Sequence, residues 1–294
     1  MSNIVYFNIN FTCNNKCVFC FSHNVGDMSR EIPIDKFIQL LNSMKLQKDD
    51  IVVINGGEPS LHSEFDSLLK YAIFLPCVCK IYTNGRKLNI GNSLSDNISF
   101  IIPVHGNKLT HNLLTRAEES FEETIASLRW LDKNRINYNL KFIINNEMIQ
   151  DDFNVLEFLE YYQLSPQEIY LSRMNVTIKS NKNQYLTPSF EDEYEYLMKL
   201  FKLLNNTDFT IKFLDFPPCY FDYLRAEYNL ITTEEHNFFY NDYNHFMEKR
   251  TYKKNRIFKS ECNYCEHIDV CNLLSNSYYL FEYKGERIIR LELE

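Results

Sequence analysis

The sequence predicts an α/β protein built on a parallel sheet. Along the first two thirds of its 294 residues, short apolar runs alternate with segments whose apolar residues recur every three or four positions. The first pattern is typical of strands buried on both faces, and the second of amphipathic helices. Six strands that alternate with helices favour parallel pairing through right-handed crossovers. Either an open doubly wound sheet or a partial barrel satisfies this pattern.

The individual elements follow from these runs. Strands are expected at residues 4–12, 51–54, 78–82, 99–104, 139–144 and 168–171. Helices are expected after Pro33, after Ser63, and at residues 121–131, 155–162 and 191–202. Pro33 suits a first helical turn because its missing N–H has no partner there in any case. Ser63 is expected to cap its helix, with Asp66 three residues further on.

Composition limits the class of protein. Hydrophobic residues make up 45% of the chain, with 23 Phe and 20 Tyr, so a packed core is available. No signal-peptide pattern and no apolar run of about 20 residues is present, which predicts a soluble, cytoplasmic protein. In a reducing compartment, nine cysteines favour metal ligation over disulfides. The net charge of -8 argues against a nucleic-acid partner.

Three cysteines lie close together directly after the first expected strand. Cys13, Cys17 and Cys20 are separated by three and then two residues, in what we call the three-cysteine loop (residues 13–20). Thiolates are soft ligands that suit iron-sulfur clusters and zinc. A four-iron cluster normally takes four thiolates, so three would leave one iron open. Half of a zinc knuckle and buried core thiols are the alternative interpretations.

A second motif, Asn-Gly-Gly-Glu-Pro at residues 55–59, directly follows the second expected strand. Gly56 and Gly57 lack side chains, as needed where a backbone approaches a ligand closely. Glu58 offers a carboxylate, and Pro59 stiffens the turn that presents it. A simple strand-ending turn is the alternative.

In this order and spacing, the two motifs resemble those of the radical S-adenosylmethionine (SAM) enzymes. The resemblance implies a partial (β/α)6 barrel of the TIM type, with SAM across the carboxyl ends of the strands. It implies a 4Fe-4S cluster whose metal ligands are Cys13, Cys17 and Cys20, and whose open iron binds SAM. It further implies that Phe19 lies beside the adenine and that Gly56, Gly57, Glu58 and Pro59 bind the SAM ammonium group.

Weaker elements continue the resemblance. Thr83 and Asn84 end the third strand as in family members that carry extra clusters, and His105 lies in the corresponding strand-four loop. The alternative for His105, and for the nearby His111, is a hydrogen-bonded structural histidine. Arg173 follows the sixth strand, and its two-pronged donor suits the SAM carboxylate. A solvated arginine is the alternative.

The last third contains four further cysteines. Cys219 follows two prolines, which favour an extended loop, and Cys262, Cys265 and Cys271 are spaced to face one centre. These four resemble the shortened SPASM, or twitch, module, which implies a second, auxiliary 4Fe-4S cluster. A structural zinc site is the alternative. The expected domains are a barrel at residues 1–205 and a small cysteine-rich module at 206–294. Cys77 and Cys79 are expected in the core.

The activity that the resemblance implies is reductive cleavage of SAM to a 5'-deoxyadenosyl radical, which takes a hydrogen atom from the substrate. No protein base is needed for this step. The favoured substrate is a ribosomally made peptide, which would be crosslinked, epimerised or oxidised. The alternatives are a small-molecule substrate and a non-catalytic metal-binding scaffold. Expected partners are a reductant such as flavodoxin or ferredoxin and a separate leader-recognition protein, since no recognition domain fits before Cys13.

Overall fold

The structure is a computed structural model of the chain. It describes residues 2–20, 31–88, 90–91, 94–174, 183, 185–204, 209–214 and 216, and the backbone of four strands further on, at 236–242, 245–249, 256–258 and 289–291. In this part of the chain, no helix is long and apolar enough to cross a lipid bilayer.

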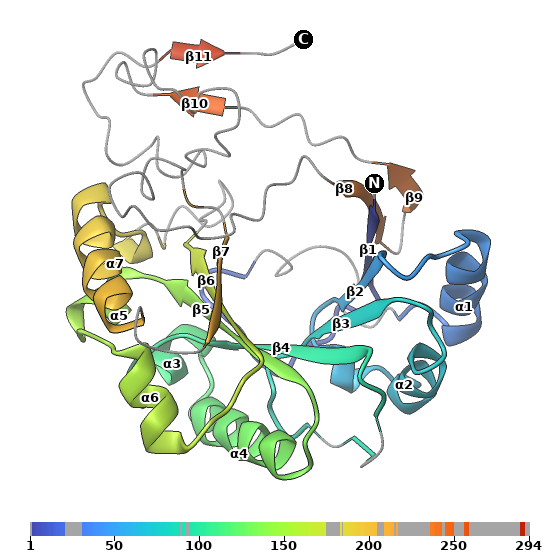
Figure 1. Cartoon of the computed structure of the whole chain (residues 1–294), viewed down its shortest axis with the longest axis horizontal. Helices are drawn as coiled ribbons and strands as arrows, with labels where there is room; N and C mark the ends of the chain where they lie inside the picture. Colours follow the sequence, from blue (N-terminus) through green and yellow to red (C-terminus); the bar gives the residue numbers. More distant parts are fainter. Residues whose placement is uncertain are drawn as a thin grey trace.

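The centre of the fold is a parallel sheet whose strands follow one another in chain order. Its strands are β1 (Ser2–Asn8), β2 (Ile51–Asn55), β3 (Val78–Tyr82), β4 (Ile98–Val104), β5 (Tyr138–Ile144), β6 (Glu168–Arg173) and β7 (Thr210–Leu214). Each pairs in parallel with the strand before it. A doubly wound sheet would reverse this order at a switch point. The order is never reversed, and the sheet curls into a half barrel with its helices outside (Figure 1).

All six expected strands are therefore confirmed, and the partial barrel is the correct alternative. The first is shorter than expected, because β1 ends at Asn8 and the chain then makes a single bridge between Asn10 and Glu31. Strand β7 is an addition that the sequence analysis missed. Its sequence, Thr-Ile-Lys-Phe-Leu, has only three apolar residues, so its strand pattern is weak.

The helices pack on the convex side of the sheet. They are α1 (Ile34–Ser43), α2 (Phe65–Ala72), α3 (Lys108–Thr115), α4 (Ser120–Lys133), α5 (Asn146–Gln150), α6 (Val155–Tyr162) and α7 (Phe190–Leu204), with a 3-10 turn, η1 (Pro59–Leu61). The expectation that Ser63 caps α2 is wrong, because Glu64 occupies the N-cap position. The Ser63 hydroxyl instead donates to Glu31 at 2.5 Å, and so it is not available to the helix.

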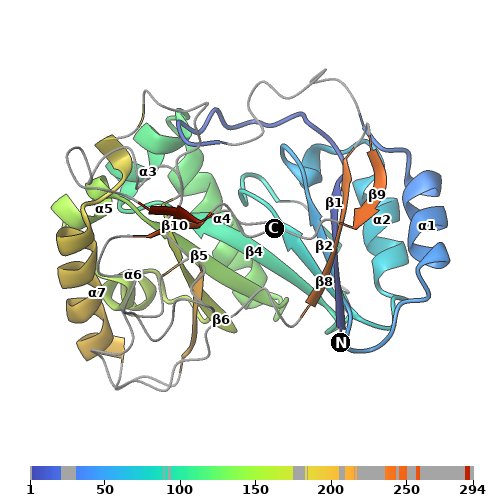
Figure 2. The ribbon, with the colours of Figure 1, turned by 90° about the horizontal axis from the view of Figure 1, so that it is seen from above.

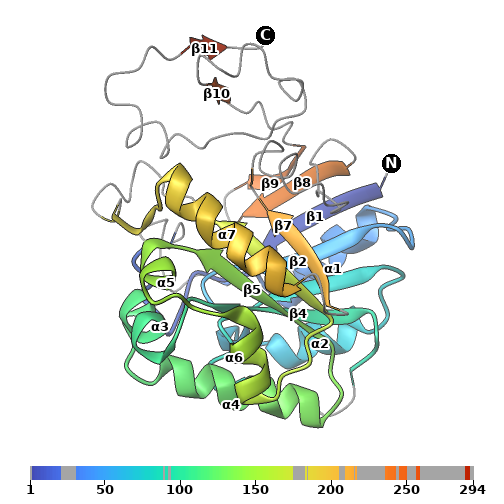
Figure 3. The same cartoon turned by 60° about the vertical axis from the view of Figure 1, so that its left-hand side comes forward.

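Two later strands extend the sheet at its other edge. β8 (His236–Asp242) pairs in parallel with β1, and β9 (His245–Lys249) pairs antiparallel with β8 (Figure 3). β10 (Arg256–Phe258) and β11 (Ile289–Leu291) form a separate antiparallel pair. β7, β8 and β9 thus belong to the barrel sheet although they follow residue 205. The boundary at 205 stays a prediction, and Cys219, Cys262, Cys265 and Cys271 lie outside the described residues.

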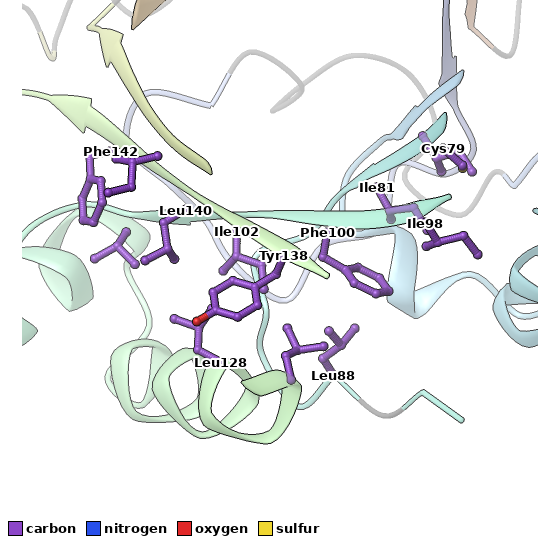
Figure 4. Packing of buried hydrophobic residues seen from close by; sticks show 14 of the residues in the cluster. Cys79, Ile81, Leu88, Ile98, Phe100, Ile102, Leu128, Tyr138, Leu140 and Phe142 are labelled. Atoms are coloured by element: carbon purple, nitrogen blue, oxygen red, sulfur yellow. The ribbon is translucent and has the colours of Figure 1, made fainter. Parts of the chain in front are cut away.

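The core lies between the sheet and its outer helices. Phe7 of β1 meets Phe37 of α1 edge to face, with ring centroids 4.9 Å apart. Further along, Tyr138 points from the sheet toward Leu128 of α4, and Phe100 points to the same side of the sheet (Figure 4). Alternate residues of each strand face these helices, and the residues between them face the concave side.

The two cysteines around the start of β3 belong to this core. Cys77 and Cys79 are 2% and 0% exposed and pack among its apolar side chains, as expected.

Candidate active site

The three-cysteine loop lies at the carboxyl edge of the sheet and is held against α3. The backbone amides of Lys16 and Val18 donate to the carbonyls of Thr115 and Leu114, at 3.0 and 2.9 Å. These carbonyls are in the last turn of α3, where they have no acceptor role within the helix. Figure 2 shows the loop running from the end of β1 toward α3. The loop is therefore held between β1, which it follows in the chain, and α3, to which its backbone is hydrogen-bonded.

The three loop cysteines are half-buried free thiols. Cys13 Sγ accepts hydrogen bonds from Asn15 N at 3.4 Å and from Asn84 Nδ2 at 3.8 Å. Burial, together with the nearby Cys20 and Cys13, raises the pKa of the Cys17 thiol to about 12. The uncharged form of the Cys17 thiol is thus favoured until a cation displaces its proton, as metal binding does.

The three loop thiols are soft donors, which is the chemistry that an iron-sulfur cluster requires. Among the described residues, no group of three or more His, Cys, Asp or Glu side chains is arranged to hold one metal ion. A zinc ion requires all of its thiolates at about 2.3 Å from one point. A cubane cluster binds each thiolate through a different iron, so its ligands need not converge so closely. Whether Cys13, Cys17 and Cys20 hold such a cluster stays a prediction.

The Gly-Gly-Glu segment extends β2 alongside the chain that leads into the three-cysteine loop. Gly57 N donates to Asn10 O at 2.9 Å, and Glu58 N donates to Thr12 O at 2.7 Å. A Cβ on Gly57 would lie 2.3 Å from Thr12 O, and one on Gly56 would lie 2.5 Å from Asn10 O. Both glycines are therefore required by the close approach of the chain's own backbone. Their role toward a cofactor stays a prediction.

Glu58 is the most firmly held carboxylate near this loop. It is 1% exposed and follows β2, with Pro59 opening the turn η1 behind it. Its Oε1 accepts from Ser60 N, Ser60 Oγ and Thr83 Oγ1 at 3.0, 2.7 and 2.6 Å, and its Oε2 accepts from Asn84 N at 2.7 Å. Burial raises the pKa of this carboxyl, and the four hydrogen bonds oppose that rise. Thr83 and Asn84 thus have a structural partner in Glu58.

We expect Glu58→Gln to lower both stability and affinity for SAM. A glutamine amide places an NH2 group where one oxygen now accepts, so at least one backbone donor, Ser60 N or Asn84 N, loses its acceptor. Leaving a buried donor unpaired costs about 1–3 kcal/mol. Urea unfolding measures the stability, and calorimetric titration measures SAM binding.

Glu160→Gln is the matched control, since Glu160 is exposed on the outer helix α6. It should change stability by less than about 0.5 kcal/mol. The raised pKa of Glu58 also fixes a sign: wild-type stability should fall as the pH rises above 4.5 toward the raised value, because the folded state holds the proton longer. Glu58→Gln should remove that slope, and an unchanged slope would contradict the assignment.

His105 and His111 lie side by side behind Phe19. The Phe19 and His105 rings meet edge to face with centroids 4.9 Å apart, and the two imidazoles stack at 5.2 Å. His111 Nδ1 accepts from His105 N at 3.3 Å, so its Nε2 carries the proton and donates to Ser120 Oγ at 3.1 Å. His111 is thus the hydrogen-bonded structural histidine. Burial lowers the pKa of His105 well below its ordinary value, and its role toward SAM stays a prediction.

Arg173 ends β6 and is 4% exposed, so the solvated alternative is wrong. Its Nε donates to Glu193 Oε2 of α7 at 2.8 Å, and Glu193 is fully buried. This ion pair ties α7 to the carboxyl end of β6. Whether the same guanidinium binds the SAM carboxylate stays a prediction.

The sequence analysis missed Arg86, which clamps the three-cysteine loop. Arg86 Nη1 donates to Asn14 O and to Asn15 Oδ1, at 2.5 and 2.9 Å, and its Nε pairs with Glu123 of α4 at 2.5 Å. Although burial raises the pKa of Glu123, bonds from Arg86 and Lys87 outweigh it and hold that pKa below its ordinary value. Arg86 stands two residues after Asn84, so its place beside a strand-ending motif was the available signal.

We expect Arg86→Gln to alter the cluster's surroundings without removing its ligands. The loop would lose the two hydrogen bonds that Arg86 donates to Asn14 and Asn15, which lie between Cys13 and Cys17. The free energy of unfolding would fall by about 1–3 kcal/mol. Iron content should stay at the wild-type level, while the electron paramagnetic resonance spectrum of the reduced cluster shifts. Arg129→Gln, on the exposed side of α4, is the control. Identical spectra for the wild type and Arg86→Gln would show that Arg86 does not position the loop.

The fold and the site together define a half-barrel protein with a curled parallel sheet, a three-thiol loop after the first strand and a buried Gly-Gly-Glu motif after the second. The profile of the Radical SAM superfamily matches residues 7–164, more than half of the chain. The chain therefore belongs to the radical SAM superfamily of enzymes.

Curated relatives match only in part. Fe-coproporphyrin III synthase of Methanosarcina barkeri is 22% identical over 53% of this chain and 41% of its own length. Mycofactocin maturase MftC of Mycolicibacterium smegmatis is 27% identical over 41% of this chain and 32% of its own. The sporulation killing factor maturation protein SkfB of Bacillus subtilis is 22% identical over 49% of this chain and 36% of its own length. The matched regions thus span less than half of each relative.

Solved structures extend the likeness of the fold. Streptococcus suis SuiB bound to S-adenosylmethionine superposes with a TM-score of 0.67 at 13% identity, over 92% of this chain and 72% of that one. SuiB bound to its precursor peptide SuiA gives a TM-score of 0.62 at 11% identity, over 92% and 70%. At these identities the match concerns the fold alone.

Proposed function

We propose that the protein is a radical SAM enzyme that reductively cleaves SAM and abstracts a hydrogen atom from a ribosomally made peptide, in crosslinking, epimerisation or oxidation. The observation that carries this proposal is the joining of the two motifs through Asn84. Its side chain donates to Cys13 Sγ, and its backbone amide donates to Glu58 Oε2 at 2.7 Å. A non-catalytic scaffold has no need for a buried carboxylate held beside a three-thiol loop.

The chain's residues have separate tasks in this proposal. Cys13, Cys17 and Cys20 would hold the 4Fe-4S cluster, which together with SAM supplies the one-electron cleavage to a 5'-deoxyadenosyl radical. Glu58 would bind the ammonium group of SAM, because a fixed carboxylate is a strong acceptor for a charged donor.

The other candidate contacts surround this pair. Phe19 would lie against the adenine with His105 behind it, and Arg173 would face the carboxylate. Gly56, Gly57, Pro59, Thr83 and Asn84 would hold the backbone and Glu58 in place. No protein side chain is assigned as a catalytic acid or base.

A peptide is the substrate that the relatives favour. MftC and SkfB are both called maturation proteins, and SuiB has been crystallised with a precursor peptide. A small-molecule substrate is the second candidate, favoured by the match to Fe-coproporphyrin III synthase. We further propose a cytoplasmic location, a flavodoxin or ferredoxin as reductant, and a separate leader-recognition protein.

An auxiliary 4Fe-4S cluster on Cys219, Cys262, Cys265 and Cys271 completes the proposal. Its support is the number and spacing of these thiols, and a structural zinc ion is the alternative.

The test is anaerobic reconstitution with iron and sulfide, followed by metal counting and a SAM cleavage assay. About eight irons per chain and reductant-dependent 5'-deoxyadenosine are expected. About four irons with one zinc would keep the radical site and discard the auxiliary cluster. If the protein binds no iron and produces no 5'-deoxyadenosine, the proposed enzyme activity is refuted.

A further inference from the structure

The concave face of the half barrel carries a polar group that the site described above does not use. It consists of Lys80 on β3, Lys141 on β5, Glu168 and Tyr170 on β6, and Lys212 on β7, and we call it the lysine group. On β6, the alternate residues Ile169 and Leu171 belong to the core under the helices. Glu168 and Tyr170 therefore point to the opposite, concave side.

The lysine group is continuous across the sheet. Lys141, Tyr170 and Lys212 stand directly opposite one another on three neighbouring strands. Lys80 Nζ donates to Tyr170 Oη at 2.9 Å, although β3 and β6 are separated by two strands. The curl of the sheet thus brings the side chains of distant strands together over its concave face.

Glu168 lies at the centre of this group. Tyr170 Oη donates to its Oε2 at 2.5 Å, Lys80 Nζ lies 3.9 Å from the same oxygen, and Lys212 forms an ion pair with its Oε1. Two ammonium groups thus share one carboxylate.

The group has an excess of positive charge in a protein whose net charge is -8. Lys141 adds a third ammonium, 5.6 Å from the centre of the Tyr82 ring. Glu168 is the one carboxylate among the described side chains at the inward positions of β1 to β7. The side chains of Lys80, Glu168 and Lys212 are 19%, 23% and 24% exposed, so solvent and solutes reach them.

The lysine group also lies next to the candidate active site. Lys141 of β5 stands opposite Pro103 of β4, two residues before His105. His105 in turn packs on Phe19 of the three-cysteine loop. A molecule bound at the lysine group would therefore extend toward the place where the radical is expected.

We propose that the lysine group binds a carboxylate of the substrate, so that the peptide modified by this enzyme carries an acidic group near the reacting carbon. This inference rests on the proposed function, whose substrate class it narrows. Lysines are single point charges, and the two that share Glu168 leave an excess of one, which matches a single carboxylate better than a polyanion. The carboxylate can come from an acidic side chain or from the end of the peptide.

The test measures binding to the reconstituted full-length protein by titration calorimetry at low and high salt. The three probes are acetyl-Gly-Glu-Ala-Glu-Gly-amide, the same peptide with both Glu replaced by Gln, and that Gln peptide with a free terminal carboxylate. The Glu peptide should bind at least about fivefold more tightly than the Gln amide at low salt, and less so at high salt. Preference for the free terminus would identify the chain end as the source.

Variants separate a binding role from a structural one. Lys141→Gln and Lys212→Gln should each lose the preference for the acidic peptide, and Lys141→Arg should keep it because the charge remains. Lys199→Gln is the control, since Lys199 is 68% exposed and pairs with Asp152 on the outside of the barrel. Circular dichroism checks that each variant folds.

The outcomes distinguish this inference from the proposed function. Equal affinities for the Glu and Gln peptides, or no binding of either, would overturn the inference even if the wild type produces 5'-deoxyadenosine. If the protein prefers the Glu peptide but does not cleave SAM, the carboxylate-binding site would be supported and the proposed radical enzyme activity would be refuted.

Discussion

Replacing Cys13, Cys17 and Cys20 together with alanine should remove about four irons per chain and abolish the cleavage of SAM. The three thiols are free, half-buried and held on one loop by backbone bonds to the last turn of α3. Outside this loop, the described residues contain no group of three or more His, Cys, Asp or Glu side chains that could hold a metal ion in its place. Iron analysis and the yield of 5'-deoxyadenosine measure the two effects.

Cys77→Ala is the matched control for this triple variant. Cys77 is a free thiol too, but it is 2% exposed and packs in the core beside β3. The Cys77→Ala variant should keep its iron and lose only the stability expected for a small cavity, about 1 kcal/mol. A triple variant that retains all of its iron and still cleaves SAM would show that the loop does not hold the reactive cluster.

The barrel strands were predictable because most of them are short, mainly apolar segments that alternate with amphipathic helices. Ile51 to Ile54 and Val78 to Tyr82 appear in the structure as β2 and β3, with at most one residue of difference. The choice between an open sheet and a half barrel could not be made from such runs, because it depends on the order of strands in space. Hydrogen-bond pairing in strict chain order resolved it.

The site was predictable where a motif is local and not where it is assembled from distant residues. Glu58 and the cysteines stand in short motifs with recognisable spacing. Arg86 and Glu123 are 37 residues apart, and nothing in either segment indicates that their ion pair supports the three-cysteine loop. The lysine group likewise depends on the curl of the sheet, which brings Lys80 to Tyr170 across 90 residues. The curvature of the sheet cannot be predicted from the sequence of any single strand.

Gly57→Ala should be the most damaging single-methyl change near the site. The added Cβ would lie 2.3 Å from Thr12 O and 2.5 Å from Phe11 O, both backbone atoms. Backbone has little freedom to yield here, because Gly57 N and Glu58 N are bonded to the same segment at 2.9 and 2.7 Å. Either the hydrogen bonds break or the loop moves. Overpacking of this kind costs about 3 kcal/mol or more, a large part of a domain's stability.

Gly91→Ala provides the matched comparison, since a Cβ at Gly91 meets nothing within 4 Å. It should leave the urea midpoint and the iron content near the wild-type values. Gly57→Ala should lower the midpoint and, where the protein still folds, reduce iron uptake because Cys13 follows Thr12 directly. The coupled loss matters most: it would show that Gly57 is conformationally required by the three-cysteine loop. Normal stability and iron together with weakened SAM binding would instead make Gly57 a contact of the cofactor alone.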